Sequence, residues 1–108
     1  MSYDISLCDD AGRPVRVAPF EDGGTYVLGG SDEAELNVTY NYAGLFGFRD
    51  LHARRASDTI PELREAVQRL GTERDADYWK PTLGNAGAAC ARLLVWAEQH
   101  PHASWSVS

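Results

Sequence analysis

The chain changes its hydrophobic period once along its length, and this change limits the folds open to it. Before residue 43, apolar and polar residues alternate in several short stretches, which is typical of half-buried strands. After residue 58, the apolar residues recur at helical spacing. Strands followed by two amphipathic helices predict an α+β fold, in which a small antiparallel sheet carries both helices packed on one face. We expect one domain over residues 1–108.

The strand predicted over residues 36–42 has the most unusual side chains. Leu36, Val38, Tyr40 and Tyr42 share one face, and the other face carries Asn37, Thr39 and Asn41. Asn is a poor strand former, so a row with two of them indicates that this polar face has a use. The row is either a solvent-facing surface or the floor of a binding site.

Other stretches predict shorter strands. Residues 3–8 alternate, a turn-forming segment follows, and residues 15–17 resume the alternation, so the two strands are expected to form a hairpin. Residues 25–28 lie between two Gly pairs and predict a short strand. Trp105 and Val107 predict either a last edge strand or a docked Trp. Self-association through an exposed sheet edge stays open.

Each helix has recognisable start signals. In the first, Thr59 is the predicted N-cap, Glu62 completes a capping box, and Gly71 follows the last turn. The second is predicted to begin near Thr82, and its inward stripe is Leu83, Ala86, Cys90, Leu93, Leu94 and Ala97. Two glycines, Gly84 and Gly87, thin its first half, so we expect either the sheet or a ligand to approach closely there.

The charge of the chain argues against general nucleic-acid binding. The formal net charge is −6, whereas binding to a polyanion depends on a basic surface. One short segment is nevertheless basic, with Arg49, His52, Arg54 and Arg55 around Asp50. This cluster suits a small anionic ligand or an acidic patch on a partner, and the alternative is a solvated loop that happens to be basic.

Signals for export or membrane insertion are missing from the sequence. There is no long apolar run and no signal-peptide layout at the N-terminus, so we expect a cytoplasmic protein with no membrane association. Cys8 and Cys90 are expected to be unpaired thiols.

Aromatic, amide and guanidinium groups together favour a binding site over a catalytic one. The rings are either stacking surfaces or ordinary core, the Asn side chains would read the edge of a base, and the arginines would pair with a phosphate. The candidate ligand-binding residues are Tyr26, Asn37, Thr39, Asn41, Arg54, Arg55, Trp79, Thr82 and Asn85. For catalysis, the only candidates are paired carboxylates, Asp75 with Asp77 or Asp9 with Asp10. We expect no metal and no cofactor, since no ligand-spacing motif is present.

Several of these strings together resemble a family of small uncharacterised phage and prophage proteins. The shared strings are Gly23-Gly24-Thr25-Tyr26 with Gly29-Gly30, the residue 36–42 stretch, Thr59-Ile60-Pro61, and Tyr78-Trp79-Lys80-Pro81-Thr82-Leu83-Gly84-Asn85-Ala86. The resemblance covers most of the chain, although Arg54 and Arg55 stand where the family is more apolar. It implies a mobile-element origin in a bacterial host cell and brings no established activity.

Three hypotheses follow. The first is a non-enzymatic phage-type accessory protein, active against bacterial defence, that sequesters a small nucleotide-like anionic ligand. The second is a protein-protein inhibitor of a bacterial defence protein, similar to an anti-CRISPR. The third is a small enzyme that acts on a nucleotide.

Overall fold

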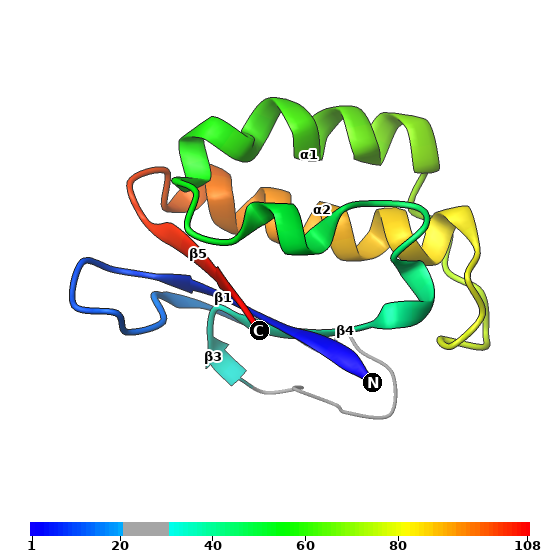
Figure 1. The fold of residues 1–108 in the computed structure, drawn as a ribbon, viewed down its shortest axis with the longest axis horizontal. Helices are drawn as coiled ribbons and strands as arrows, with labels where there is room; N and C mark the ends of the chain where they lie inside the picture. Colours follow the sequence, from blue (N-terminus) through cyan, green and yellow to red (C-terminus); the bar gives the residue numbers. More distant parts are fainter. Residues whose placement is uncertain (21–30) are drawn as a thin grey trace.

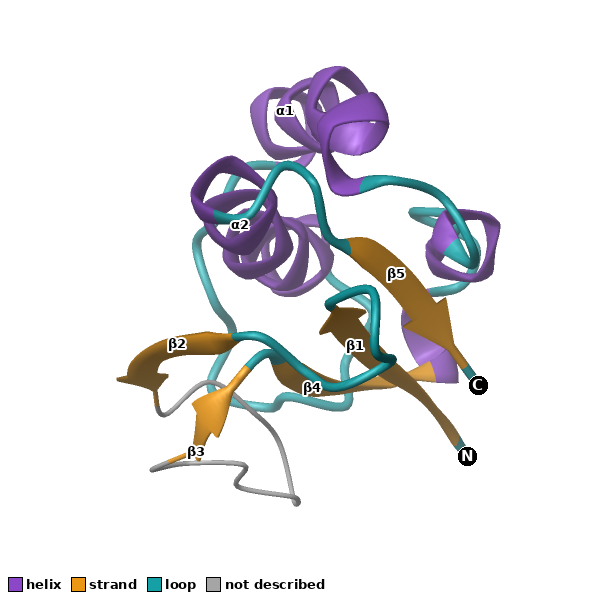
Figure 2. Cartoon of the chain, turned by 90° about the vertical axis from the view of Figure 1, so that its left-hand side faces the viewer, coloured by secondary structure: helices purple, strands orange, loops and turns teal. Residues whose placement is uncertain are grey.

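The computed structural model describes residues 1–20 and 31–108, and its fold is α+β as predicted (Figure 1). Both helices lie on the same side of the main sheet, with α1 farther from it than α2 (Figures 1 and 2). The elements are β1 (Ser2–Cys8), β2 (Arg16–Phe20), β3 (Ser31–Glu33), β4 (Glu35–Thr39), the 3₁₀ turns η1 (Tyr40–Tyr42) and η2 (Phe48–Leu51), α1 (Ala56–Leu70), α2 (Leu83–Gln99) and β5 (Ser104–Val107).

Strand β1 is the centre of an antiparallel sheet with the order β4-β1-β5. Tyr3, Ile5 and Leu7 of β1 are buried in the core, and the residues between them face the other side of the sheet. Because β4 and β5 occupy both edges of β1, the chain turns at Cys8 and Pro14, and β2 then pairs with β3. The predicted hairpin is therefore confirmed as far as Leu7 and Val15, where the N–H of Val15 donates to the carbonyl of Leu7 at 2.9 Å, and beyond that point the chain leaves β1.

Strand β4 ends at Thr39, three residues earlier than predicted. The Thr39 hydroxyl accepts a hydrogen bond from the backbone N–H of Asn41 at 3.2 Å and so caps the turn η1. A hydroxyl or amide side chain offers the backbone a local alternative to the strand ladder, and this turn uses it. The predicted row of Asn37, Thr39 and Asn41 on one face of a strand is consequently wrong.

Helix α1 begins one turn earlier than its predicted N-cap. Its N-cap is Arg55, four residues before Thr59, and the first N–H groups of the helix are satisfied by the segment that precedes β5. Ala56, for example, donates to a carbonyl of that segment at 2.8 Å. The predicted capping box is therefore absent, and Glu62 pairs with Arg54 instead. Thr59 is buried, where its hydroxyl accepts from the Trp105 indole at 2.9 Å and links α1 to β5.

Helix α2 begins at Leu83 with Thr82 as its N-cap, as predicted. A Cβ atom on Gly87 would lie 1.6 Å from the carbonyl oxygen of Gly71, and one on Gly84 would lie 1.8 Å from another carbonyl of the same connection. The group that approaches this thin part of α2 is thus the backbone between the helices, rather than the sheet or a ligand. Leu83 is exposed and is not part of the inward stripe.

Other segments engage both outer edges of the three-stranded sheet. Along β5, Trp105 exchanges backbone hydrogen bonds of 2.9 Å with residues 53 and 54, and the N–H of Val107 donates to Nδ1 of His52 at 3.0 Å. Along β4, the contact comes from the Tyr78 hydroxyl. Each outer edge of the sheet is therefore occupied in part, which limits the self-association considered from the sequence.

Cys8 and Cys90 are free, as predicted. Among the described residues, none of the helices is both long enough and apolar enough to cross a membrane.

Candidate functional site

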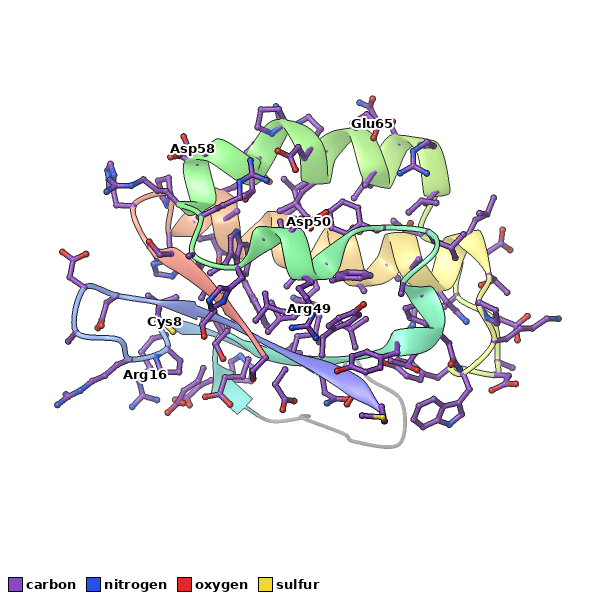
Figure 3. The ribbon with its side chains drawn as sticks, in the orientation of Figure 1. Cys8, Arg16, Arg49, Asp50, Asp58 and Glu65 are labelled. Atoms are coloured by element: carbon purple, nitrogen blue, oxygen red, sulfur yellow. The ribbon has the colours of Figure 1, made fainter. Side chains whose placement is uncertain are left out.

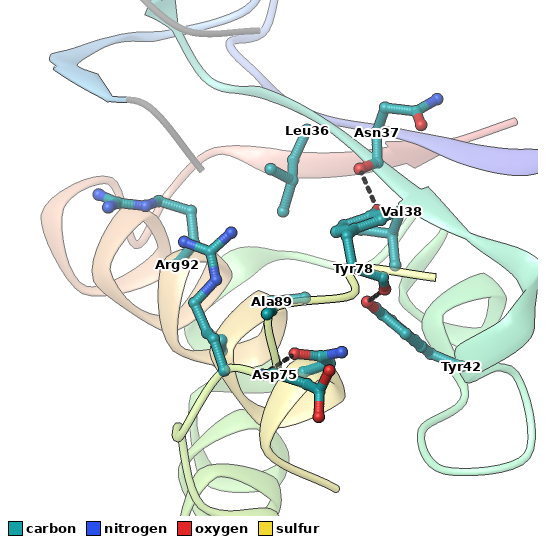
Figure 4. Close-up of a pocket in the computed structure, with 12 residues that line it drawn as sticks. Leu36, Asn37, Val38, Tyr42, Asp75, Tyr78, Ala89 and Arg92 are labelled. Carbon is teal, nitrogen blue, oxygen red and sulfur yellow. Dashed lines mark hydrogen bonds between the residues drawn. The ribbon is translucent and has the colours of Figure 1, made fainter. Parts of the chain in front are cut away.

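A cavity among the described residues lies between β4 and α2 (Figure 4). Residues 72–81, which we call the strap, close one side of it as they cross from α1 to α2. The cavity has a volume of about 210 Å³, and it is lined by Leu36, Asn37, Val38, Tyr42, Arg74, Asp75, Ala76, Tyr78, Asn85, Ala88, Ala89 and Arg92. Its walls are therefore mixed, with apolar side chains from β4 and α2 and polar or charged side chains from α2 and the strap.

Asn85 anchors the strap to α2. Its side chain is buried, with 6% of the residue exposed, and its Oδ1 accepts from the backbone N–H of Asp75 at 2.8 Å. Its Nδ2 donates to the carbonyl oxygens of Asp77 at 3.0 Å and Lys80 at 2.9 Å. These three hydrogen bonds of the amide all go to the strap backbone, so Asn85 shapes one wall of the pocket.

Two tyrosines anchor the strap on the side of the sheet. The Tyr78 hydroxyl accepts from the N–H of Thr39 at 3.1 Å and donates to the carbonyl of Asn37 at 3.2 Å. The Tyr42 hydroxyl donates to the carbonyl of Tyr78, and the two ring centroids lie 5.6 Å apart. Burial raises the pKa of both tyrosines above the ordinary value of 10, so both hydroxyls stay protonated at neutral pH.

Two guanidinium groups give the pocket its positive charge. Arg92 lies in its wall, and its guanidinium carbon is 5.3 Å from the centre of the Phe20 ring (Figure 4). Arg74 lowers the pKa of Tyr42 and Tyr78 against the larger effect of burial, so its charge acts on the tyrosine side of the pocket. The carboxylate of Asp75 is the opposing charge, and one of its oxygens lies 4.0 Å from Nζ of Lys80.

Four of the nine predicted site residues, Asn37, Asn41, Trp79 and Asn85, lie in or beside the strap, but their polar groups bind other parts of the chain. The amide of Asn37 points away from the pocket and donates to Ser2 and Asp4 on the outer face of the sheet (Figure 4). Asn41 donates to the carbonyl of Trp79 at 2.8 Å, and the Trp79 side chain lies outside the pocket lining.

The remaining predicted residues are not brought to this pocket. Thr39 is buried beneath its turn, and Thr82 caps α2. Arg54 and Arg55 precede α1, whose first turn lies at the opposite end of the molecule from the strap (Figures 1 and 3). Tyr26 and the strand predicted over residues 25–28 lie outside the described residues.

Sequence reasoning missed Arg74 and Arg92. A signal for Arg92 was available, because Asn85, Ala88, Ala89 and Arg92 follow one another at helical spacing and so share one face of α2. No comparable signal marks Arg74, since its segment reads as an acidic connection. Its place in the lining depends on how the strap folds back over α2.

The carboxylates considered for catalysis have structural partners. Asp75 accepts from the N–H of Asp77 at 2.8 Å, and Asp77 accepts from the N–H of Trp79 at 3.0 Å, so each closes a turn of the strap. Asp9 does the same in the turn after β1, where it accepts from Ala11 and Arg13. Within residues 1–20 and 31–108, no group of three or more His, Cys, Asp or Glu side chains is arranged to hold a metal ion.

Comparison of the chain with known proteins gives no matching family model, no matching curated protein and no matching solved structure.

Proposed function

We propose that this protein binds a small nucleotide-like anion in the pocket beneath the strap and holds it without converting it. The observation that carries the proposal is a cavity of about 210 Å³ whose lining combines Arg74 and Arg92 with tyrosine rings and aliphatic side chains. Guanidinium groups bind phosphates and carboxylates in a planar, two-pronged geometry. The apolar and aromatic walls supply a surface for the body of the ligand.

The anchoring of the strap supports a preformed site. Asn85 holds it from α2, and Tyr42 and Tyr78 hold it from the opposite side. A pocket whose walls are already bonded loses little conformational entropy when a ligand enters. This property suits a protein that competes for a scarce ligand, because sequestration of such a ligand requires high affinity.

The size of the pocket limits the ligand. Sites that enclose drug-sized molecules have volumes of about 300–1,000 Å³, and this cavity of about 210 Å³ is smaller. A dinucleotide would therefore be enclosed only in part. A mononucleotide is the nucleotide class that fits best, and the proposed biological setting is a phage-type accessory protein that acts against bacterial defence.

Trp79 favours a second candidate function, the occlusion of a bacterial defence protein. Its backbone N–H donates to the Asp77 carboxylate, and its backbone carbonyl accepts from the Asn41 amide, while 38% of the residue is exposed. A Trp held on a fixed backbone loses little freedom on binding and is a frequent hot spot at protein interfaces. Trp79→Ala would abolish co-purification of such a partner and leave ligand binding in the pocket unchanged.

The test of the first candidate is isothermal titration with adenosine 5′-monophosphate. We expect saturable binding to the wild type and a loss of about ten-fold or more in affinity for Arg92→Gln, since a charge-assisted hydrogen bond contributes about 1.5–3 kcal/mol. Arg64→Gln is the matched control, because it removes the same charge from α1, where Arg64 pairs with Glu98 at 3.1 Å.

Equal weakening by the two variants would show that net charge, rather than the pocket, attracts the anion. Conversion of the nucleotide during the titration, lost in Asp75→Asn, would favour the enzyme hypothesis instead.

A further inference from the structure

Each neutral polar side chain in the described lining is hydrogen-bonded within the chain, and this bears on what the pocket can recognise. Distinguishing one nucleobase from another requires side-chain or backbone donors and acceptors that meet the edge of the base. In the described lining, the amide of Asn85 is bonded to the strap, and the hydroxyls of Tyr42 and Tyr78 are bonded to backbone groups. The amide of Asn37 is directed to the outer face of the sheet (Figure 4).

The charged side chains of the described lining are two arginines and one aspartate. Arg74 and Arg92 supply positive charge, and Asp75 has one oxygen bonded to the N–H of Asp77 and the other facing Lys80. The rest of the described lining consists of the tyrosine rings and the side chains of Leu36, Val38, Ala76, Ala88 and Ala89. Such a surface responds to the shape and the charge of a ligand, since every base has a similar flat face.

The neutral polar side chains are bonded within the chain, and the arginines supply the charge. From this we infer that the pocket selects for a planar or compact body joined to an anionic group and does not distinguish among nucleobases. The inference rests on the proposed function and names its ligand class: a nucleoside monophosphate of any base. Asn85 is a candidate from the sequence for binding the edge of a base, but in the structure it is buried and anchors the strap. The arginines thus become the determinants of specificity, and they act on the phosphate.

The test is one titration series with the full-length wild type and its Arg92→Gln variant. The ligands are the 5′-monophosphates of adenosine, guanosine, cytidine and uridine, with uncharged adenosine as the control. We expect the dissociation constants of the four monophosphates to agree within about three-fold, and adenosine to bind about ten-fold or more weakly than its monophosphate. Arg92→Gln should weaken all four monophosphates by a similar factor.

The possible outcomes separate the two proposals. Binding of one monophosphate at least ten-fold more tightly than the others would overturn the inference and leave the proposed function standing. A loss in Arg92→Gln that is confined to the guanosine ligand would do the same, because it would show Arg92 contacting the base. Failure of all four monophosphates to bind a folded wild type would overturn the proposed function, and the inference with it.

Discussion

Removing the amide of Asn85 should destabilise the whole protein. The substitution Asn85→Ala deletes the three hydrogen bonds to the backbone of Asp75, Asp77 and Lys80. The strap is largely exposed, so water can reach part of the freed backbone, and each bond is best valued at the ordinary net contribution of about 1 kcal/mol. The expected loss is therefore about 3 kcal/mol in the free energy of unfolding.

Equilibrium unfolding in urea measures this loss. For a slope of about 1–3 kcal/mol/M, a loss of about 3 kcal/mol lowers the midpoint by about 1–3 M. The matched control is Asn41→Ala, which deletes one hydrogen bond between an exposed residue and Trp79 of the strap and should cost about 1 kcal/mol or less. If Asn85→Ala costs no more than Asn41→Ala, the amide is not the anchor described above, and the pocket wall must be held by other contacts.

Three further outcomes are expected. Gly87→Ala should cost about 3 kcal/mol or more in thermal unfolding, because its Cβ would meet a carbonyl oxygen at 1.6 Å, whereas Gly44→Ala has open space and should stay within about 0.5 kcal/mol of the wild type. Tyr78→Phe should speed hydrogen exchange at the N–H of Thr39, which loses its acceptor, and unchanged exchange in an NMR series would contradict the geometry of the strap. The hydrogen bond from Arg54 lowers the pKa of Glu62 below its ordinary value of 4.5, so this pair stabilises the fold above that pH and loses its effect as the pH falls further. For such an exposed pair, the stability difference between the wild type and Glu62→Gln is at most about 1 kcal/mol. This difference should shrink in urea titrations as the pH falls from about 5 to about 3. A difference that grows with acid would contradict the assignment.

Periodicity was sufficient to predict the fold class and the second helix. The alternation in β1 and the cap at Thr82 are local signals, and nothing in the tertiary structure competes with them. The start of α1 could not be found in this way, because its first N–H groups bind carbonyls about 45 residues later in the chain. A side-chain cap at Thr59 is a valid local pattern, but burial of that residue against Trp105 gives its hydroxyl other partners.

The candidate site was harder to predict, because its residues depend on how the strap is folded. Asn41 and Asn85 were identified as polar residues that needed an explanation, and the structure supplies one within the chain. Arg54 looked like a phosphate ligand, yet it binds Glu62, eight residues away. Arg74 and Arg92 come together only because the strap crosses α2 at two glycines, and no single-sequence pattern reports that crossing.

The contact between Tyr78 and β4 has a consequence for the solution behaviour of the protein. A strand at the border of a sheet can recruit matching strands from other molecules and so begin a fibril. Here the Tyr78 hydroxyl binds the backbone N–H of Thr39 and the carbonyl of Asn37 at that border, and Tyr78 also lines the pocket. Enlarging the cavity by shortening Tyr78 would thus also remove a safeguard against cross-β assembly, which ties the capacity of the pocket to the protein's resistance to aggregation.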